Sequence, residues 1–225
     1  MSPPRDEAEL LTRARQLAGL TLHELSVRIS QPLPPDPRRA KGWIGIAVEK
    51  ALGAQGASRA VPDFPDLGVE LKTLPVDRRG RPRESTFVCT VDLSEIGDME
   101  WHESRVCRKL SRVLWVPVES ELGVPFPARR VGQPLLWSPS HEEQDELRFD
   151  WEDLSGMIAR GELDRVTGHL GKSLQVRPKA ANSRARRRYH DDTGVAHRTL
   201  PRGFYLRPSF TERLLTGTFF VTDGV

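Results

Sequence analysis

The chain has 225 residues, of which 37% are hydrophobic and 29% charged, a balance typical of a globular protein rather than a disordered one. No apolar run approaches the roughly 20 residues of a membrane span, and the first residues lack a secretory signal, so we expect a cytoplasmic protein that does not enter the membrane. The two cysteines fit a reducing compartment, and a net charge of +3 by itself names no partner.

Three helices are expected in the first 53 residues. Helical spacing runs over residues 7–20 and ends near Gly19, and Thr21 followed by Glu24 forms a capping box that predicts a second helix. After a proline-rich break, the stretch "KGWIGIAVEKALG" (41–53) predicts a third helix. Its buried stripe is expected to contain Ile44, Ala47, Val48, Ala51 and Leu52.

Another face of this third helix carries two glycines beside one carboxylate. At 100° per residue, Gly42, Gly45 and Glu49 fall together. Glycine lowers helix stability, so this bare backbone indicates either a partner that binds closely or tight helix packing with Glu49 in solvent. The sequence leaves both interpretations open.

Residues 69–72 alternate in polarity and predict a strand. Val69 and Leu71 are apolar, while Glu70 and Lys72 share the opposite face, because residues two apart in a strand point the same way. After a turn-rich basic connection, "STFVCTVDL" (85–93) predicts a second strand. We expect the two strands to form a hairpin or meander that carries the site.

The rest of the chain mixes helices and strands. A short helix is expected within 103–112, a buried strand over the continuous apolar run 112–119, and a longer helix within 138–161 with a capping box at Ser140 and Glu143. Strands are expected at 172–178 and 202–208. This mixture predicts the α/β or α+β class. The long helix is expected to bury Leu147, Trp151, Leu154 and Ile158.

Positive charge gathers in one window. Between Arg177 and Arg207 there are nine basic residues and two acidic ones, so this window carries +7 while the remainder of the chain is net acidic. Such a local excess favours a polyanion partner such as nucleic acid. The alternative is a solvated loop.

Several motifs can be excluded. "GHLGKS" (168–173) resembles a phosphate loop, but the glycine that the Walker pattern requires is replaced by Val166, so we do not predict ATP binding. The sequence contains no HExxH, CxxC or GxSxG, and its six histidines lack ligand spacing, which argues against a zinc site.

Two acids and a lysine in "DFPDLGVELKT" (63–73) have the composition of a phosphodiester-cleaving site. Mg²⁺ takes oxygen ligands, commonly one or two carboxylates, which Asp63 and Glu70 would provide together with the backbone carbonyl of Leu71. Lys72 would stabilise negative charge on the phosphate. The alternative is a solvated ion pair on a strand, with a value well under ~1 kcal/mol. The nearby Glu49 and the basic window favour the catalytic interpretation.

Longer stretches of the chain are similar to one family. "KGWIG", "DFPDLGVELKTLPVD", "ESTFVC", "KLSRVLWVPVE", "RRVGQPLLWSP", "LQVRPKAAN" and "LPRGFYL" resemble MutH, the methyl-directed mismatch-repair endonucleases. The resemblance implies an α/β, restriction-endonuclease-like fold, with a mixed β-sheet flanked by helices. It implies a single domain over residues 1–225 with two lobes around a DNA-binding cleft, the site residues in the N-terminal lobe and a base-reading loop in the C-terminal lobe.

The resemblance also implies the activity. It predicts Mg²⁺-dependent nicking of the unmethylated strand at hemimethylated GATC sites in double-stranded DNA, by a monomer that MutL activates after MutS finds a mismatch. Asp63 and Glu70 become metal ligands and Lys72 the catalytic lysine, joined by Glu49 and Lys109. The residues expected to contact DNA are Lys41, Phe87, Arg177, Pro178, Lys179, Ala180, Arg184, Arg202 and Tyr205.

Within that set, "RPKAAN" corresponds to the base-reading loop and Tyr205 to the residue that senses the adenine N6 position. Two other functions remain open. The first is a stand-alone GATC restriction endonuclease of the same fold, which would cut both strands. The second is a non-catalytic GATC-binding module, in which the two acids and the lysine are structural.

Overall fold

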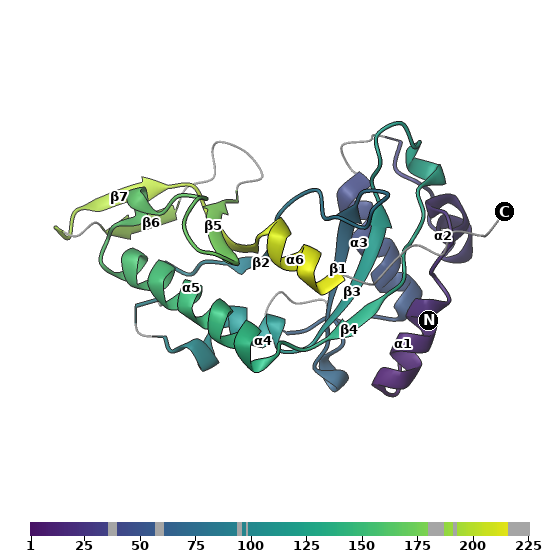
Figure 1. Cartoon of the computed structure of the whole chain (residues 1–225), viewed down its shortest axis with the longest axis horizontal. Coiled ribbons are helices and arrows are strands. Elements are labelled where there is room, and N and C mark those ends of the chain that lie inside the picture. Colours follow the sequence, from purple (N-terminus) through teal and green to yellow (C-terminus); the bar gives the residue numbers. More distant parts are fainter. Residues whose placement is uncertain are drawn as a thin grey trace. The chain divides into compact units, whose positions relative to one another are not determined.

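The computed structural model describes residues 1–35, 40–56, 61–93, 96–97, 99–179, 187–190 and 193–215. The chain forms two compact units (Figure 1). The first contains residues 1–84, 112–138 and the chain from Glu212 onward, and the second contains residues 85–111 and 139–211. Over these described ranges, no helix is both long enough and apolar enough to cross a bilayer.

The first unit begins with three helices, as predicted. They are α1 (Glu7–Arg15), α2 (Leu22–Arg28) and α3 (Ala40–Leu52). The capping box of α2 is present in full, since the Thr21 hydroxyl accepts from the Glu24 N–H and the Glu24 carboxylate accepts from the Thr21 N–H. Helix α3 packs against the first strand, and α1 and α2 pack against α3 (Figure 1).

A mixed three-stranded sheet completes this unit. It contains β1 (Glu70–Val76), β3 (Val113–Glu119) and β4 (Leu135–Trp137) in the order β1-β3-β4, with β1 parallel and β4 antiparallel to β3. The apolar run of β3 is buried over six of its seven residues, as a central strand requires. Short 3₁₀ turns lie at Pro65–Leu67 and Phe126–Ala128.

The expected hairpin between the first two strands is wrong. Strand β2 (Thr86–Thr90) lies in the other unit and pairs with β8 (Arg202–Leu206). The reason is that β3, buried over six of its seven residues, takes both β1 and β4 as neighbours. The connection after β1 turns at Asp77 and leads the chain out of the first sheet.

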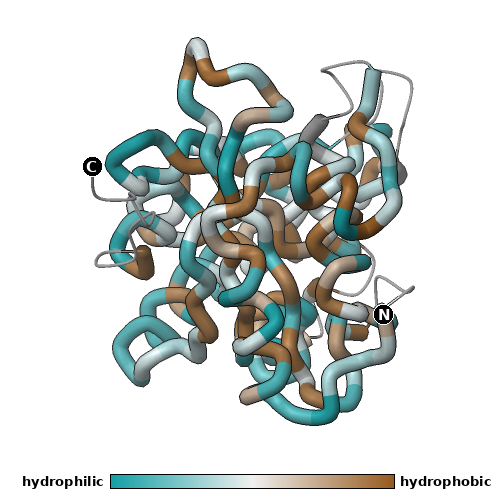
Figure 2. Tube along the Cα trace, turned by 90° about the vertical axis from the view of Figure 1, so that its right-hand side faces the viewer, coloured by the Kyte–Doolittle hydropathy of each residue, from teal (hydrophilic) through white to brown (hydrophobic). Residues whose placement is uncertain are grey.

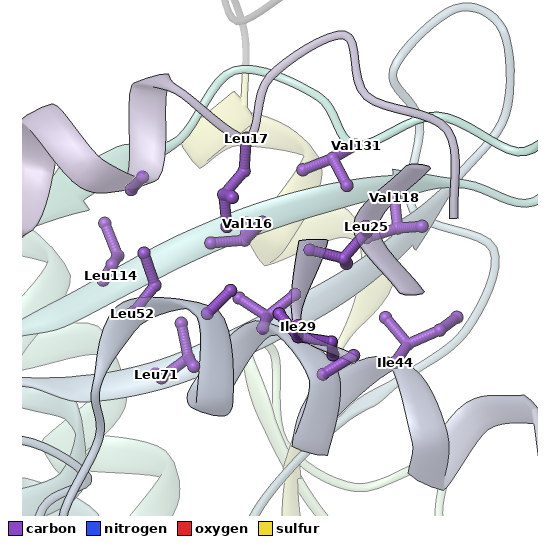
Figure 3. Packing of buried hydrophobic residues seen from close by; sticks show 14 of the residues in the cluster. Leu17, Leu25, Ile29, Ile44, Leu52, Leu71, Leu114, Val116, Val118 and Val131 are labelled. Atoms are coloured by element: carbon purple, nitrogen blue, oxygen red, sulfur yellow. The ribbon is translucent and has the colours of Figure 1, made fainter. Parts of the chain in front are cut away.

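The core of the first unit lies between α3 and this sheet. The predicted stripe of α3 is buried, including Ala47, Val48 and Leu52, and it contacts Leu71 and Leu114 of the strands (Figure 3). Fully burying one such aliphatic side chain contributes about 1.5–3 kcal/mol. In Figure 2 the brown, apolar stretches run mostly through the interior of the trace. The packing fixes α3 against β1, the two elements that carry the predicted acids.

The second unit holds an antiparallel sheet in the order β2-β8-β5, where β5 is Leu174–Pro178. Helix α5 (His141–Ala159) packs against β5 and begins with the predicted capping box. The remaining elements are η3 (Trp101–Glu103), α4 (Arg105–Leu110), η5 (Leu163–Arg165), the hairpin β6 (Arg187–His190) with β7 (Ala196–Thr199), and α6 (Pro208–Leu215), which crosses into the first unit.

The segment that resembled a phosphate loop binds a carboxylate of its own chain. Asp150 on α5 is buried and accepts hydrogen bonds from the N–H groups of Lys172, Ser173 and Leu174 at 2.6–2.8 Å. Arg207 donates to the carbonyls of Gly168, Leu170 and Gly171 on the same turn. These backbone donors are therefore already used, and the segment connects α5 to β5.

The fold class is confirmed as a mixture of α and β elements with small sheets and flanking helices. The restriction-endonuclease-like architecture and the arrangement of two lobes around a cleft stay predictions.

Candidate active site

A tight loop brings Asp63 back to the start of β1. Phe64 and Val69 exchange backbone hydrogen bonds of 2.9 and 3.2 Å, which close the loop around the 3₁₀ turn Pro65–Leu67. As a result, Asp63 Oδ2 accepts from the Leu71 N–H at 2.8 Å. Two residues eight apart in sequence thus become direct neighbours.

The backbone of Asp63 is also tied to the segment after α3. The N–H groups of Gln55 and Gly56 both donate to the Asp63 carbonyl at 3.0 Å. A Cβ on Gly56 would lie 2.7 Å from the Asp63 Cα and 2.7 Å from the Pro62 oxygen, so only glycine permits this approach. The end of α3 and the loop carrying Asp63 are therefore held together.

Glu70 and Lys72 form the ion pair that the strand pattern predicts. Lys72 Nζ donates to Glu70 Oε1 at 2.6 Å, and the two side chains are only 13% and 4% exposed. The interpretation as a solvated surface pair is therefore wrong. Removing two charges from water costs free energy, which their mutual attraction offsets only in part. A contribution to folding stability therefore does not by itself explain why this pair is buried.

Glu49 on α3 belongs to the same electrostatic site. Its pKa is raised first by burial and then by the nearby carboxylates of Asp63 and Glu70, while Lys72 acts in the opposite direction. Asp63, Glu70 and Lys72 are thus all close enough to act on the ionisation of Glu49. Perturbed groups of this kind are typical of functional sites.

The two glycines of α3 are not required for packing inside the described part of the chain. A Cβ on Gly42 would meet no described atom within 4 Å, and one on Gly45 would reach only Glu49 Oε1, at 4.0 Å. Tight helix packing therefore does not explain them among these residues. A closely bound partner at this face stays a prediction.

The donor set fits a hard divalent cation. Two carboxylates, Asp63 and Glu70, repel Glu49, and a cation near them would relieve that repulsion. Among the described residues no three His, Cys, Asp or Glu side chains are grouped so that they could hold a metal ion by themselves. The expected ligands are two carboxylates and a backbone carbonyl, with the remaining positions for water and phosphate, which is how Mg²⁺ is commonly held.

The backbone carbonyl of Leu71 is placed so that it could serve as the third metal ligand. Strand β1 is an edge strand, and the Glu70 N–H donates across to Arg112 of the β3 side. Alternate residues of a strand direct their backbone groups to opposite sides, so the Leu71 N–H and C=O point away from β3, toward Asp63.

In the second unit, four of the predicted DNA-contacting residues, Phe87, Arg177, Lys179 and Tyr205, lie on one side of the sheet. The Phe87 and Tyr205 rings meet edge to face with centroids 5.3 Å apart, and Lys179 Nζ lies 2.7 Å from the Phe87 ring centroid. Burial raises the pKa of the Tyr205 phenol, with Arg177 nearby acting in the opposite direction. Arg177 is exposed on the neighbouring strand, β5.

Three residues of this face were not predicted. Ser85 Oγ accepts from Gln175 Nε2 at 2.7 Å and from Arg177 Nη1 at 3.2 Å, and Gly203 lies directly beside Phe87. The Ser85 contacts join positions about ninety residues apart, which local patterns do not reveal. Alternation along β5, which places positions 175, 177 and 179 on one face, is the only signal that could have found Gln175.

The other predicted site residues are distributed as follows. Lys109 lies half-buried on α4 in the second unit, and its place beside the acids stays a prediction. Pro178 is exposed at the end of β5, and Arg202 donates to the Val166 carbonyl at 3.4 Å. Ala180 and Arg184 lie outside the described residues, as does the side chain of Lys41, whose backbone begins α3.

Comparisons with known proteins agree on one family. The family model "DNA mismatch repair enzyme MutH" matches residues 52–150. The chain is 50% identical over 220 residues to the DNA mismatch repair protein MutH of Klebsiella pneumoniae (strain 342), covering 98% of this chain and 95% of the relative. It is 51% identical over 223 residues to the DNA mismatch repair protein MutH of Salmonella typhi, which covers 99% of this chain and 96% of the relative. It is 49% identical over 219 residues to the DNA mismatch repair protein MutH of Serratia proteamaculans (strain 568), which covers 97% of this chain and 96% of the relative.

Proposed function

The chain belongs to the MutH family of DNA mismatch repair enzymes, and from this premise we propose that it is a Mg²⁺-dependent endonuclease. The proposed reaction is nicking of the unmethylated strand at hemimethylated GATC sites. The observation that carries the proposal is the shielded Glu70–Lys72 pair beside Asp63, with Glu49 in the same electrostatic site.

Each of these residues has a role in the proposal. Asp63, Glu70 and the Leu71 carbonyl would hold Mg²⁺, which when bound offsets phosphate charge and acidifies the attacking water. Lys72, fixed against Glu70 at 2.6 Å, stabilises the negative charge that develops on the phosphate. Its low exposure strengthens that interaction, because charges act over a lower dielectric when water is excluded.

Glu49 is suited to proton exchange with a water molecule. Burial and the two neighbouring carboxylates raise its pKa above its ordinary value, and a carboxylate with a raised pKa is a better proton acceptor. Helix α3 carries it on the face with Gly42 and Gly45, where a Cβ on Gly42 would meet no described atom within 4 Å.

Sequence and methylation recognition belong to the second unit in this proposal. Arg177, on β5, and Lys179, one residue beyond it, carry donors that match the O6 and N7 acceptors of guanine in the major groove. The adenine N6 position faces the same groove, so a methyl group there would press on Tyr205 and slow the cutting of that strand.

We further propose that the protein acts as a monomer, that MutL activates it, and that MutS contributes indirectly. One site would then cut one strand per binding event. A symmetric dimer on the self-complementary GATC sequence would instead place a site on each strand.

A strand-resolved cleavage assay tests the proposal. Duplexes with one GATC site are prepared unmethylated, hemimethylated on either strand and fully methylated, and each is incubated with and without Mg²⁺ and with and without MutL. We expect nicks in the unmethylated strand only, no cutting of fully methylated DNA, no cutting without Mg²⁺, and faster nicking with MutL. Linear products from a one-site plasmid, without MutL, would instead favour the restriction endonuclease.

A further inference from the structure

One face of the Phe87 ring is covered by the ammonium group of Lys179. Lys179 Nζ lies 2.7 Å from the centroid of the Phe87 ring, over its face. The negative face of an aromatic ring attracts an ammonium, and the attraction increases when water is partly excluded. Both side chains are half-buried. The covered face of Phe87 is therefore not available to stack on a base.

Two contacts fix the partners of this cation–π pair. The Lys179 N–H donates to the Pro201 carbonyl at 2.6 Å, which anchors the backbone one residue beyond β5. On the other side, the edge of the Phe87 ring meets the Tyr205 ring at 5.3 Å and an interplanar angle of 65°. Strand β8 thus supports the ring, and Pro201, just before β8, supports the lysine.

Gly203 makes this arrangement possible. A Cβ at that position would lie 2.9 Å from Phe87 Cε2 and 3.2 Å from both Tyr205 Cε2 and the Cys89 oxygen. The Phe87 ring is the nearest of the three and would have to move, while the Tyr205 ring and the Cys89 backbone oxygen leave little space on the other sides. Any larger residue at position 203 therefore displaces Phe87 from the position in which it faces Lys179.

We propose that Phe87 is a positioning residue, whose ring face orients the Lys179 ammonium toward a guanine edge, and that Gly203 keeps that ring in place. This inference rests on the proposed function, because it takes Lys179 as a reader of GATC. The new element is that guanine recognition by Lys179 depends on its contact with the ring of Phe87 on strand β2. Without the Phe87 ring, Lys179 keeps its charge but loses its orientation. Discrimination between GATC and other sequences should therefore decrease more than the affinity for DNA in general.

The test combines a protein change with a DNA change. Single-turnover nicking rates are measured on hemimethylated GATC duplexes that contain guanine or 7-deazaguanine, which lacks N7. The proteins are wild type, Phe87→Leu, Phe87→Trp, and Phe149→Leu, the last a matched control at a 73% exposed phenylalanine on α5. We expect 7-deazaguanine to slow wild type, Phe87→Trp and Phe149→Leu several-fold.

We expect Phe87→Leu to nick normal GATC about 3- to 30-fold more slowly, and to show no further loss on 7-deazaguanine. Gly203→Ala should behave like Phe87→Leu. Binding to DNA without GATC should stay within about twofold of wild type. If Phe87→Leu does not fold, a ring-fluorinated phenylalanine at position 87 preserves the shape, weakens the ring face and gives the same comparison.

An NMR measurement tests the contact between Lys179 and the Phe87 ring independently of nicking activity. The Lys179 Cε protons should be shifted upfield by the Phe87 ring in wild type and should lose that shift in Phe87→Leu. A folded Phe87→Leu protein that keeps the full 7-deazaguanine penalty overturns this inference alone. Wild-type protein that does not nick GATC at all contradicts the proposed function and, with it, this inference.

Discussion

At the residue scale, Asp77 shows how one carboxylate ends a strand. It follows β1 and is only 7% exposed. Its Oδ1 accepts from the N–H groups of Arg79 and Arg81 at 2.9 Å, and its Oδ2 from Arg81 Nε at 3.0 Å. Burial pushes the Asp77 pKa upward, but the hydrogen bonds from Arg81 and Arg79 outweigh it, and the pKa is lowered.

The lowered pKa of Asp77 predicts a pH-dependent stability. A carboxylate with a folded pKa below its unfolded value of about 3.9 stabilises the protein above that pH, and the contribution is lost as pH falls through the folded pKa. We therefore expect Asp77→Asn to lower the free energy of unfolding by about 1–2 kcal/mol at pH 7, with the difference shrinking below pH ~4.

Urea denaturation of both proteins between pH 3 and pH 7 measures this difference. The exposed Asp66→Asn is the matched control and should stay within about 0.5 kcal/mol of wild type throughout. A difference for Asp77→Asn that grows toward low pH would contradict the account.

Side-chain chemistry at the residue scale was largely predictable. The alternation of residues 69–72 is sufficient to place Glu70 beside Lys72, and the ion pair confirms it. The hydrogen bond from the Leu71 N–H to Asp63 was not predictable, because it depends on the closed loop 64–69 and on Gly56 contacting Asp63. Nor does the sequence indicate how deeply the Glu70–Lys72 pair is buried.

At the element scale, helices and strands were predictable but their pairing was not. Capping boxes and apolar stripes identify α2, α3 and α5, and the apolar run identifies β3. The partner of β1 depends on long-range competition between strands, which made the expected β1–β2 hairpin wrong. The hairpin β6–β7 was missed because its sequence lacks an apolar period, and three of the four residues of β7 are exposed.

Asp150 gives a prediction for the connection between α5 and β5. Replacing it with Asn leaves one amide oxygen for three N–H donors and points an N–H₂ group at them. We expect Asp150→Asn to lower the free energy of unfolding by about 2–3 kcal/mol, because hydrogen bonds to a buried charged group are lost.

Urea denaturation at pH 7 checks this value, with Asp153→Asn, exposed on the same helix, as the control. The control should change stability by no more than about 0.5 kcal/mol. Equal stability losses in the two variants would show that the turn at 168–173 does not depend on Asp150.

At the scale of the whole molecule, charge and chemistry are divided between the two units. The acids and Lys72 belong to the first unit, while the basic window from Arg177 to Arg207 belongs to the second. The uneven charge was readable from the sequence, whereas the division into units was not, because the chain passes between them several times. A consequence is that cutting and DNA affinity should be separable by mutation.

The most direct test of the central claim measures nicking and DNA binding together in Lys72→Met and Glu70→Gln. Lys50→Met, an exposed lysine on α3, is the matched control. We expect both site variants to bind a GATC duplex within about threefold of wild type and to lose at least about 10³-fold in nicking rate. Lys72→Met removes the charge that acts on the reacting phosphate, and Glu70→Gln removes the charge of a proposed Mg²⁺ ligand. Nicking at the wild-type rate in either folded variant would contradict the claim that this pair forms the active site.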